Sequence, residues 1–174
     1  MAKIVPYDEL EKDLAGNAVA DFVWITPHQC HDMHGVSPGS AALLKMPDCG
    51  YPDAGLDHGA IKLGDAYLAD VVAKITGSAA WREGASLVIV WDEDDYAGFA
   101  GTAGSPIGVN QTILGGSRTP LIVLNSSDQQ KPQKLDAPAN HYNLLAAIED
   151  AWQLGCLQNS CAAGKANTLA GVIK

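Results

Sequence analysis

The sequence lacks the patterns that would assign it to a membrane or nucleic-acid-binding class. No apolar run approaches the roughly 20 residues that span a bilayer, and residues 1–6 show no apolar core of a signal peptide. Basic residues are few and scattered, with 11 Lys and Arg against 20 Asp and Glu, so the net charge is −9. Because clustered Lys and Arg neutralise phosphate backbones, this composition excludes a nucleic-acid surface.

Several well-known catalytic motifs are missing too. The sequence contains no G-x-S-x-G elbow, no Walker loop, no H-E-x-x-H pair and no Rossmann fingerprint. It also contains no C-x-x-C pair, which makes a structural zinc site an unsuitable explanation for its cysteines. Any chemistry must therefore come from less regular clusters of polar residues.

The residues that are present suit one globular domain spanning 1–174. Apolar residues make up 47% of the chain and charged residues 18%. A chain of this length buries roughly 70% of its unfolded surface, so it needs neither metal nor disulfide to fold. The four cysteines, at 30, 49, 156 and 161, permit two disulfides in three connectivities. Four reduced thiols are the alternative, and spacing alone leaves both open.

Three short apolar runs predict buried strands, at 22–25, 87–91 and 121–124. They are continuous and rich in β-branched residues, which is typical of a parallel sheet covered on both faces. Apolar stripes predict a helix between Asp65, as its cap, and Gly77, a second over 142–152 with Asn140 as its cap, and a third over about 7–14. This order of elements predicts an α/β layered domain with a mostly parallel sheet flanked by helices.

Each predicted strand is followed at once by polar residues, at 26–34, 92–95 and 125–128. In open α/β sheets, ligands bind beyond the carboxyl ends of parallel strands. Parallel strands would therefore gather all three clusters on one rim, which predicts a binding site there.

The acidic cluster 92–95 contains four consecutive carboxylates, which repel one another unless solvent, a counter-charge or a cation intervenes. Hard divalent metals prefer such oxygen ligands. Tyr96 stands where an EF-hand needs its third acidic ligand, so the run is not an EF-hand. A solvated acidic turn is the alternative interpretation.

The histidines near residue 30 form a second candidate cluster. His31, Asp32 and His34 could bind a metal, transfer a proton or hold a phosphate oxygen; the alternative is a loop histidine bonded to a neighbouring carboxylate. His141 stands at a predicted helix start, where backbone N–H groups favour an anion, although a histidine there also serves as a cap or for packing.

Four segments in the same order carry a family resemblance: residues 25–35, 64–68, 90–93 and 140–150. Together they resemble the phosphoesterase family of bacterial phospholipases C and acid phosphatases, which has the alkaline-phosphatase-like superfold. The resemblance extends from about Ile4 to Leu157. It implies metal-assisted hydrolysis of a small phosphomonoester or of the phosphodiester of a phospholipid head group. It also implies a location outside the cytoplasm.

The resemblance further implies roles for particular residues. Asp92 and Glu93 correspond to the acidic pair that binds a divalent metal ion in the family. His31, Asp32 and His34 correspond to residues at or beside the phosphate pocket. His141 lies in the C-terminal motif and is grouped with the substrate-binding residues.

The chain also departs from the family pattern. The family's Glu-Asn metal motif and its Ser or Thr nucleophile have no counterpart here, and residues 94–99 lack the expected Gly-Phe-x-Asp-His. The chain is therefore expected to be the C-terminal portion of a phosphoesterase-like catalytic domain, with no nucleophile of its own identified. The alternatives are a non-catalytic metal- or ligand-binding domain and an interaction domain. The latter would use an open sheet edge to form a homo-oligomer or to bind a complementing chain.

Overall fold

The computed structural model describes residues 4–50, 58–82, 84–92, 119–127 and 134–174. The chain divides into two compact units. The first unit comprises residues Met1–Trp81 and Trp91–Thr119, and the second comprises Arg82–Val90 and Pro120–Lys174. No helix within the described ranges is long and apolar enough to cross a membrane.

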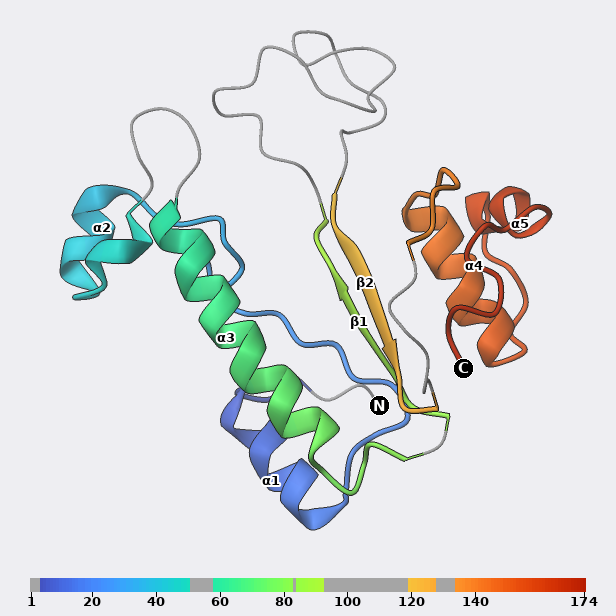
Figure 1. Ribbon diagram of the computed structural model, residues 1–174, viewed down its shortest axis with the longest axis horizontal. Helices are drawn as coiled ribbons and strands as arrows, with labels where there is room; N and C mark the ends of the chain where they lie inside the picture. The colour runs from blue at the N-terminus through green and yellow to red at the C-terminus, as the bar shows by residue number, and fades with distance from the viewer. Residues whose placement is uncertain (1–3, 51–57, 83, 93–118, 128–133) are drawn as a thin grey trace, which may run out of the picture. The chain divides into compact units, whose positions relative to one another are not determined.

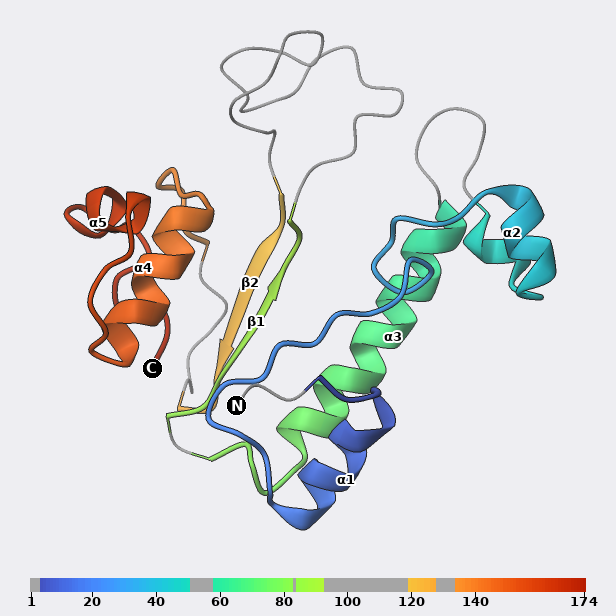
Figure 2. The same cartoon turned by 180° about the vertical axis from the view of Figure 1, so that it is seen from behind.

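The first unit is helical and is organised around its longest helix, α3 (His58–Thr76). In Figures 1 and 2, α1 (Asp8–Gly16) lies along the C-terminal half of α3. Near the N-terminal end of α3 lie α2 (Pro38–Leu43) and the short 3-10 helix η1 (Pro47–Cys49). A small apolar cluster forms here, made of buried Cys30, Ala41 and Cys49 with Val36, Met46 and Leu63 packed against them.

Helix α3 begins earlier than the sequence indicates. It starts at His58, so Asp65 lies within the helix and does not cap it, whereas Gly77 directly follows its last residue as predicted. The low helix propensity of Gly59 and Gly64 hides this first part of the helix. Both glycines are needed for packing: a Cβ on Gly59 would lie 2.4 Å from the Asp48 carbonyl oxygen.

The second unit contains the two strands and the C-terminal helices. Strand β1 (Ser86–Val90) pairs with β2 (Leu121–Asn125), and α4 (His141–Ala151) packs against α5 (Asn159–Gly164). An apolar cluster joins the α4 side to the sheet and the C-terminal residues; its members are Ala147, Leu169 and Ile173, with Val88, Leu121, Leu144, Ile148 and Val172 around them. The Asn140 side chain accepts hydrogen bonds from the N–H groups of Tyr142 and Asn143 in a capping box, which confirms its predicted role.

The predicted α/β class is confirmed in its general form, as helices with a small sheet, but the expected parallel pairing is wrong for these two strands. They pair antiparallel, with Ser86 opposite Asn125 and Val90 opposite Leu121. A parallel pair needs a crossover, which is usually a helix. The sequence from 98 to 119, which joins the two strands, is rich in glycine and shows no sustained helical period, so it did not favour a parallel crossover.

The antiparallel register also corrects the prediction that three polar clusters share one rim. Val90 and Asn125 end their strands at opposite ends of the pair. Asn125 has a structural role instead: its amide donates to the Val172 carbonyl at 3.1 Å and its oxygen accepts from the Ser86 hydroxyl at 2.6 Å. The cluster that begins at Asn125 is therefore not part of the candidate site.

The apolar run 22–25 does not form the predicted strand either. Its backbone has no regular secondary structure, and Trp24 is 72% exposed. A strand requires a neighbour for its N–H and C=O groups, and no described strand pairs with this segment. The Trp24 indole N–H donates locally to the Thr26 hydroxyl at 3.0 Å.

Candidate functional site

The first unit contains the histidine loop, residues 28–35, whose backbone is held by its own hydrogen bonds. The N–H groups of His31 and Asp32 donate to the His28 carbonyl at 2.7 and 3.1 Å, and Gly35 donates to the Gln29 carbonyl at 2.7 Å. Met33 and Gly35 have positive φ angles of 73° and 78°, so the chain reverses sharply between the histidines. The loop is a compact turn with a defined backbone.

A disulfide fixes the histidine loop to the rest of the first unit. Cys30 is bonded to Cys49 in η1, and both are almost fully buried, at 1% and 0% exposure. Beside them, the Val36 N–H donates to the Cys49 carbonyl at 2.8 Å. The second disulfide joins Cys156 to Cys161, so all four cysteines are paired and the expectation of disulfides is confirmed.

The loop rests directly on α3 at Gly64. A Cβ at this position would lie 2.4 Å from Met33 Cγ and 3.0 Å from the His31 carbonyl oxygen. No side chain larger than hydrogen fits without displacing one of them. Gly64, which belongs to the segment 64–68 of the family resemblance, is thus the point where the loop contacts the helix.

Aromatic rings from the loop and from α3 contact one another. The ring centroids of His28 and His31 are 4.1 Å apart, and His31 stacks on Tyr67 at 4.8 Å with an interplanar angle of 13°. Tyr7 lies 5.7 Å from Tyr67. Burial, with the nearby His28, lowers the pKa of His31 below its usual value, although Asp32 opposes the shift. Burial raises the pKa of Tyr67 to about 12, so both rings are neutral near pH 7.

Hydrogen bonds select the tautomers of the two outer histidines. His28 Nδ1 accepts from the Cys30 N–H at 3.2 Å, so a neutral His28 carries its proton on Nε2 and can donate from there. His34 Nδ1 lies 3.0 Å from the Gly35 carbonyl, which can only accept, so a neutral His34 has its lone pair on Nε2. One loop therefore offers a donor and an acceptor nitrogen.

Asp32 organises the end of the loop and connects it to Trp91. One of its carboxylate oxygens accepts from the His34 N–H at 2.8 Å. Its carbonyl accepts from the Trp91 indole N–H at 2.8 Å. Trp91 immediately precedes Asp92, which is exposed, so the first residue of the acidic cluster directly follows a residue that is bonded to the histidine loop.

The residues proposed to bind a metal are only partly described. Asp92 is described, whereas Glu93, Asp94 and Asp95 lie outside the described residues. Within the part of the chain that the structure covers, no three His, Cys, Asp or Glu side chains gather closely enough to hold a metal ion. The carboxylate chemistry of Asp92 fits a hard divalent cation, and a complete ligand set would need Glu93 as well.

His141 is the remaining predicted site residue and belongs to the second unit. It is the first residue of α4 and is exposed, directly after the Asn140 cap. Its position at a helix start is as predicted from the sequence.

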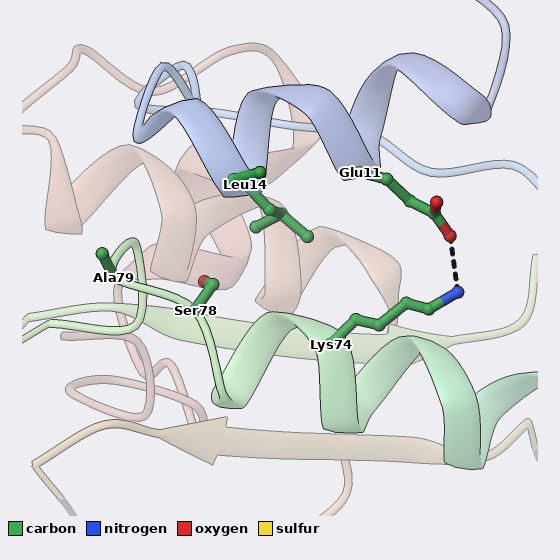
Figure 3. Close-up of a pocket in the computed structure, with 6 residues that line it drawn as sticks. Glu11, Leu14, Lys74, Ser78 and Ala79 are labelled. Carbon is green, nitrogen blue, oxygen red and sulfur yellow. Dashed lines mark hydrogen bonds and ion pairs between the residues drawn. The ribbon is translucent and has the colours of Figure 1, made fainter.

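A pocket between α1 and α3 contains none of the predicted site residues (Figure 3). Its lining residues are Glu11, Leu14, Ala15, Lys74, Ser78 and Ala79. The Lys74 ammonium forms ion pairs with Glu11 at 2.6 Å and Asp70 at 2.7 Å. The cation is therefore already paired with two carboxylates, and the pocket is a poor binding site for phosphate.

Helix α3, the disulfide-held histidine loop that rests on it and the two-stranded sheet define a class of protein: a disulfide-containing α/β protein with a polar loop on one helix. Comparison with protein families is more specific. Residues 1–155 match the phosphoesterase family, and the chain belongs to this family. No curated protein and no solved structure matches the chain.

Sequence reasoning singled out His31, Asp32 and His34 but missed the residues that support them. In the sequence, Tyr67 belongs to an apolar helical stripe and, with Gly64, to the family segment 64–68, and neither residue is assigned a role at the site. The signal was present in their spacing, because residues three apart on a helix share a face. What the loop places on that face could not be read from the sequence.

Proposed function

We propose that this chain is a phosphoric-ester hydrolase domain in which the histidine loop and the segment beginning at Asp92 form one phosphate-binding site. The 2.8 Å hydrogen bond from the Trp91 indole to the Asp32 carbonyl carries this proposal. It ties Trp91, the residue directly before Asp92, to the loop, and this supports a shared site. Family membership supports the reaction class, and the expected substrates are phosphomonoesters or phospholipid head-group phosphodiesters.

In this proposal each residue has a role that follows from its charge and its hydrogen-bonding groups. Asp92 and Glu93 would hold a divalent metal ion, which supplies positive charge to the phosphoryl oxygens when it is bound. The Nε2–H of His28 can donate to a phosphate oxygen, and the Nε2 of His34 can accept a proton. His31 and Asp32 lie between these two histidines and are proposed to bind the same phosphate. For His141, at the start of α4, substrate binding is proposed only from its place in the family's C-terminal motif.

The test is hydrolysis of p-nitrophenyl phosphate and of p-nitrophenyl phosphorylcholine, with and without added divalent metal. We expect turnover that requires metal and falls at least about 100-fold in Asp92→Ala, a loss typical of removing an electrostatic group from a phosphoryl-transfer site. Asp21→Ala, which removes an exposed carboxylate from the same unit, is the matched control and should retain activity. Turnover that is equal in Asp92→Ala and wild type would contradict the assignment.

A second candidate is a non-catalytic ligand-binding or interaction domain. It is favoured by the sequence, which contains no counterpart of the family's Glu-Asn motif or nucleophile. In this case the chain would be the C-terminal portion of a catalytic domain that is completed by a complementing chain or a second copy. The exposed Val23 and Trp24, at 44% and 72%, are apolar groups that such a partner would cover. Phosphate binding without turnover, together with a dimer in sedimentation, would favour this candidate.

The disulfides bear on where the protein works. Two disulfides are consistent with an extracytoplasmic protein, because reducing compartments keep such thiols free. We propose an extracytoplasmic location on this basis. Fractionation of the producing cells, with detection by antibody, would test it.

A further inference from the structure

We propose that Tyr67 is a positioning residue for the phosphate-binding site: its ring, presented by α3, holds the His31 imidazole in one orientation. The inference rests on the proposed function of the histidine loop and adds a residue that the loop itself does not contain. The observation that carries it is the parallel stack of His31 on Tyr67, with centroids 4.8 Å apart and planes inclined by 13°.

The backbone at His31 is fixed by contacts that do not involve Tyr67. The disulfide holds the preceding residue, Cys30, against η1, and the His31 N–H donates to the His28 carbonyl at 2.7 Å. The His31 carbonyl lies against Gly64 of α3. The side-chain torsions are therefore the remaining freedom of this residue, and a ring face beside the imidazole restricts them.

Tyr67 is placed for this purpose by helix geometry. It follows Gly64 by three residues, so both lie on the face of α3 that meets the loop. Because Gly64 has no side chain, the loop backbone can approach α3 at this position. The ring of Tyr67 then contacts the imidazole of His31. A neighbouring contact supports Tyr67 itself, because its ring lies 5.7 Å from that of Tyr7.

The contact depends on the ring of Tyr67 and not on its hydroxyl. The hydroxyl oxygen is buried and has no hydrogen-bond partner of good geometry among the residues that the structure describes, and what interaction it has is with Tyr7 and not with His31. Burial also raises the pKa of Tyr67 to about 12, so the side chain brings no charge to the loop near pH 7. A phenylalanine should therefore position His31 as well as tyrosine does, and an aliphatic residue should not.

The test compares Tyr67→Leu with Tyr67→Phe in the full chain, using two measurements. The first is the proton and nitrogen NMR signals of the His31 ring, which are shifted by the adjacent aromatic face. The second is the affinity for inorganic phosphate, measured by NMR titration. We expect Tyr67→Leu to move the His31 signals toward those of a free histidine and to weaken phosphate binding about three- to tenfold, as expected when one side chain must be immobilised on binding.

Tyr67→Phe is the rescue variant and should reproduce both wild-type values. If Tyr67→Leu does not fold, Tyr67→Met, which keeps an unbranched side chain in the helix, replaces it. Unchanged His31 signals in the folded aliphatic variant would overturn the proposal, and so would signals that move equally in Tyr67→Phe. Failure of wild type to bind phosphate would instead overturn the proposed function, because the His31 signals report positioning without any ligand.

Discussion

Gly64 shows how a single residue on α3 permits the site to form. Replacing Gly64 with Ala adds a Cβ that would lie 2.4 Å from Met33 Cγ and 3.0 Å from the His31 carbonyl oxygen. The substitution gains about 1 kcal/mol in helix propensity, but overpacking costs about 1–3 kcal/mol, so we expect a net loss of stability. Urea unfolding measures the change, and the His31 NMR signals should shift as the loop moves.

Gly39 provides the matched control for this prediction. It lies in α2, and a Cβ there meets no atom within 4 Å. Gly39→Ala should therefore be neutral or stabilising by up to about 1 kcal/mol. Equal effects of the two substitutions would show that the loop does not rest on Gly64. Adding Met33→Ala to Gly64→Ala should recover part of the loss.

His31 makes a pH-dependent contribution whose sign follows from its lowered pKa. Below pH 6.5, the usual pKa of histidine, His31 takes up a proton in the unfolded chain. In the folded protein, mainly because of burial, His31 takes up this proton only at lower pH. This contribution is complete above pH 6.5 and is lost as pH falls from there to the folded-state pKa. We expect the stability difference between wild type and His31→Asn, measured by urea unfolding, to shrink over this window. A difference that stays constant would contradict the lowered pKa.

Individual site residues differ in how far the sequence predicts them. His31, Asp32 and His34 could be singled out as candidates because they are clustered in the chain and match a family segment. Tyr67 could not, since an aromatic residue in an apolar stripe is usually part of a core. Its role depends on the loop that Gly64 admits, and that contact joins residues more than 30 positions apart.

At the scale of elements, the Cys30–Cys49 disulfide should contribute more to stability than Cys156–Cys161. It closes a segment of 19 residues, against five for the other, and in the loop-entropy account a segment of this size contributes about 3 kcal/mol. Both of its cysteines are also buried in an apolar cluster. Replacing each pair by alanine and measuring urea unfolding should show the larger loss for the first pair.

This comparison has a functional readout as well. Because Cys30 lies within the histidine loop, removal of the Cys30–Cys49 disulfide should weaken inorganic phosphate binding, whereas removal of the Cys156–Cys161 disulfide in the other unit should not. Identical phosphate affinities in both variants would mean that the disulfide does not hold the loop in its binding conformation.

The elements themselves could be predicted where local signals sufficed. Asn140 and the apolar face after it predicted α4, because a cap and a stripe are both local. The predicted parallel direction of β1 and β2 was wrong. The direction in which two strands pair depends on the connection between them, and the apolar runs carry no information about it. The run 22–25 was equally ambiguous, because apolar β-branched residues indicate a strand only where a partner strand exists.

At the scale of the whole molecule, each unit contributes a different part of the family pattern. The first unit holds the histidine loop and Asp92, and the second holds His141 with the C-terminal motif. Family membership was predictable because four segments occur in the right order along the chain. This order is read from the sequence and does not depend on the predicted strand directions. The net charge of −9 adds a general attraction for cations, so any metal effect must be separated from it.

A charge-matched thermal shift experiment makes this separation. Metal that binds only the folded protein stabilises it by about 2.7 kcal/mol at 100 times Kd, which raises Tm by about 5–10 °C for a chain of this size. We expect this rise for wild type with excess Mn²⁺ or Mg²⁺ at constant ionic strength, and its loss in Asp92→Asn. Asp21→Asn changes the net charge equally but removes an exposed carboxylate elsewhere in the first unit, so it should keep the full shift. If both variants lose the same small part of the shift, the metal responds to overall charge, and Asp92 is not a ligand.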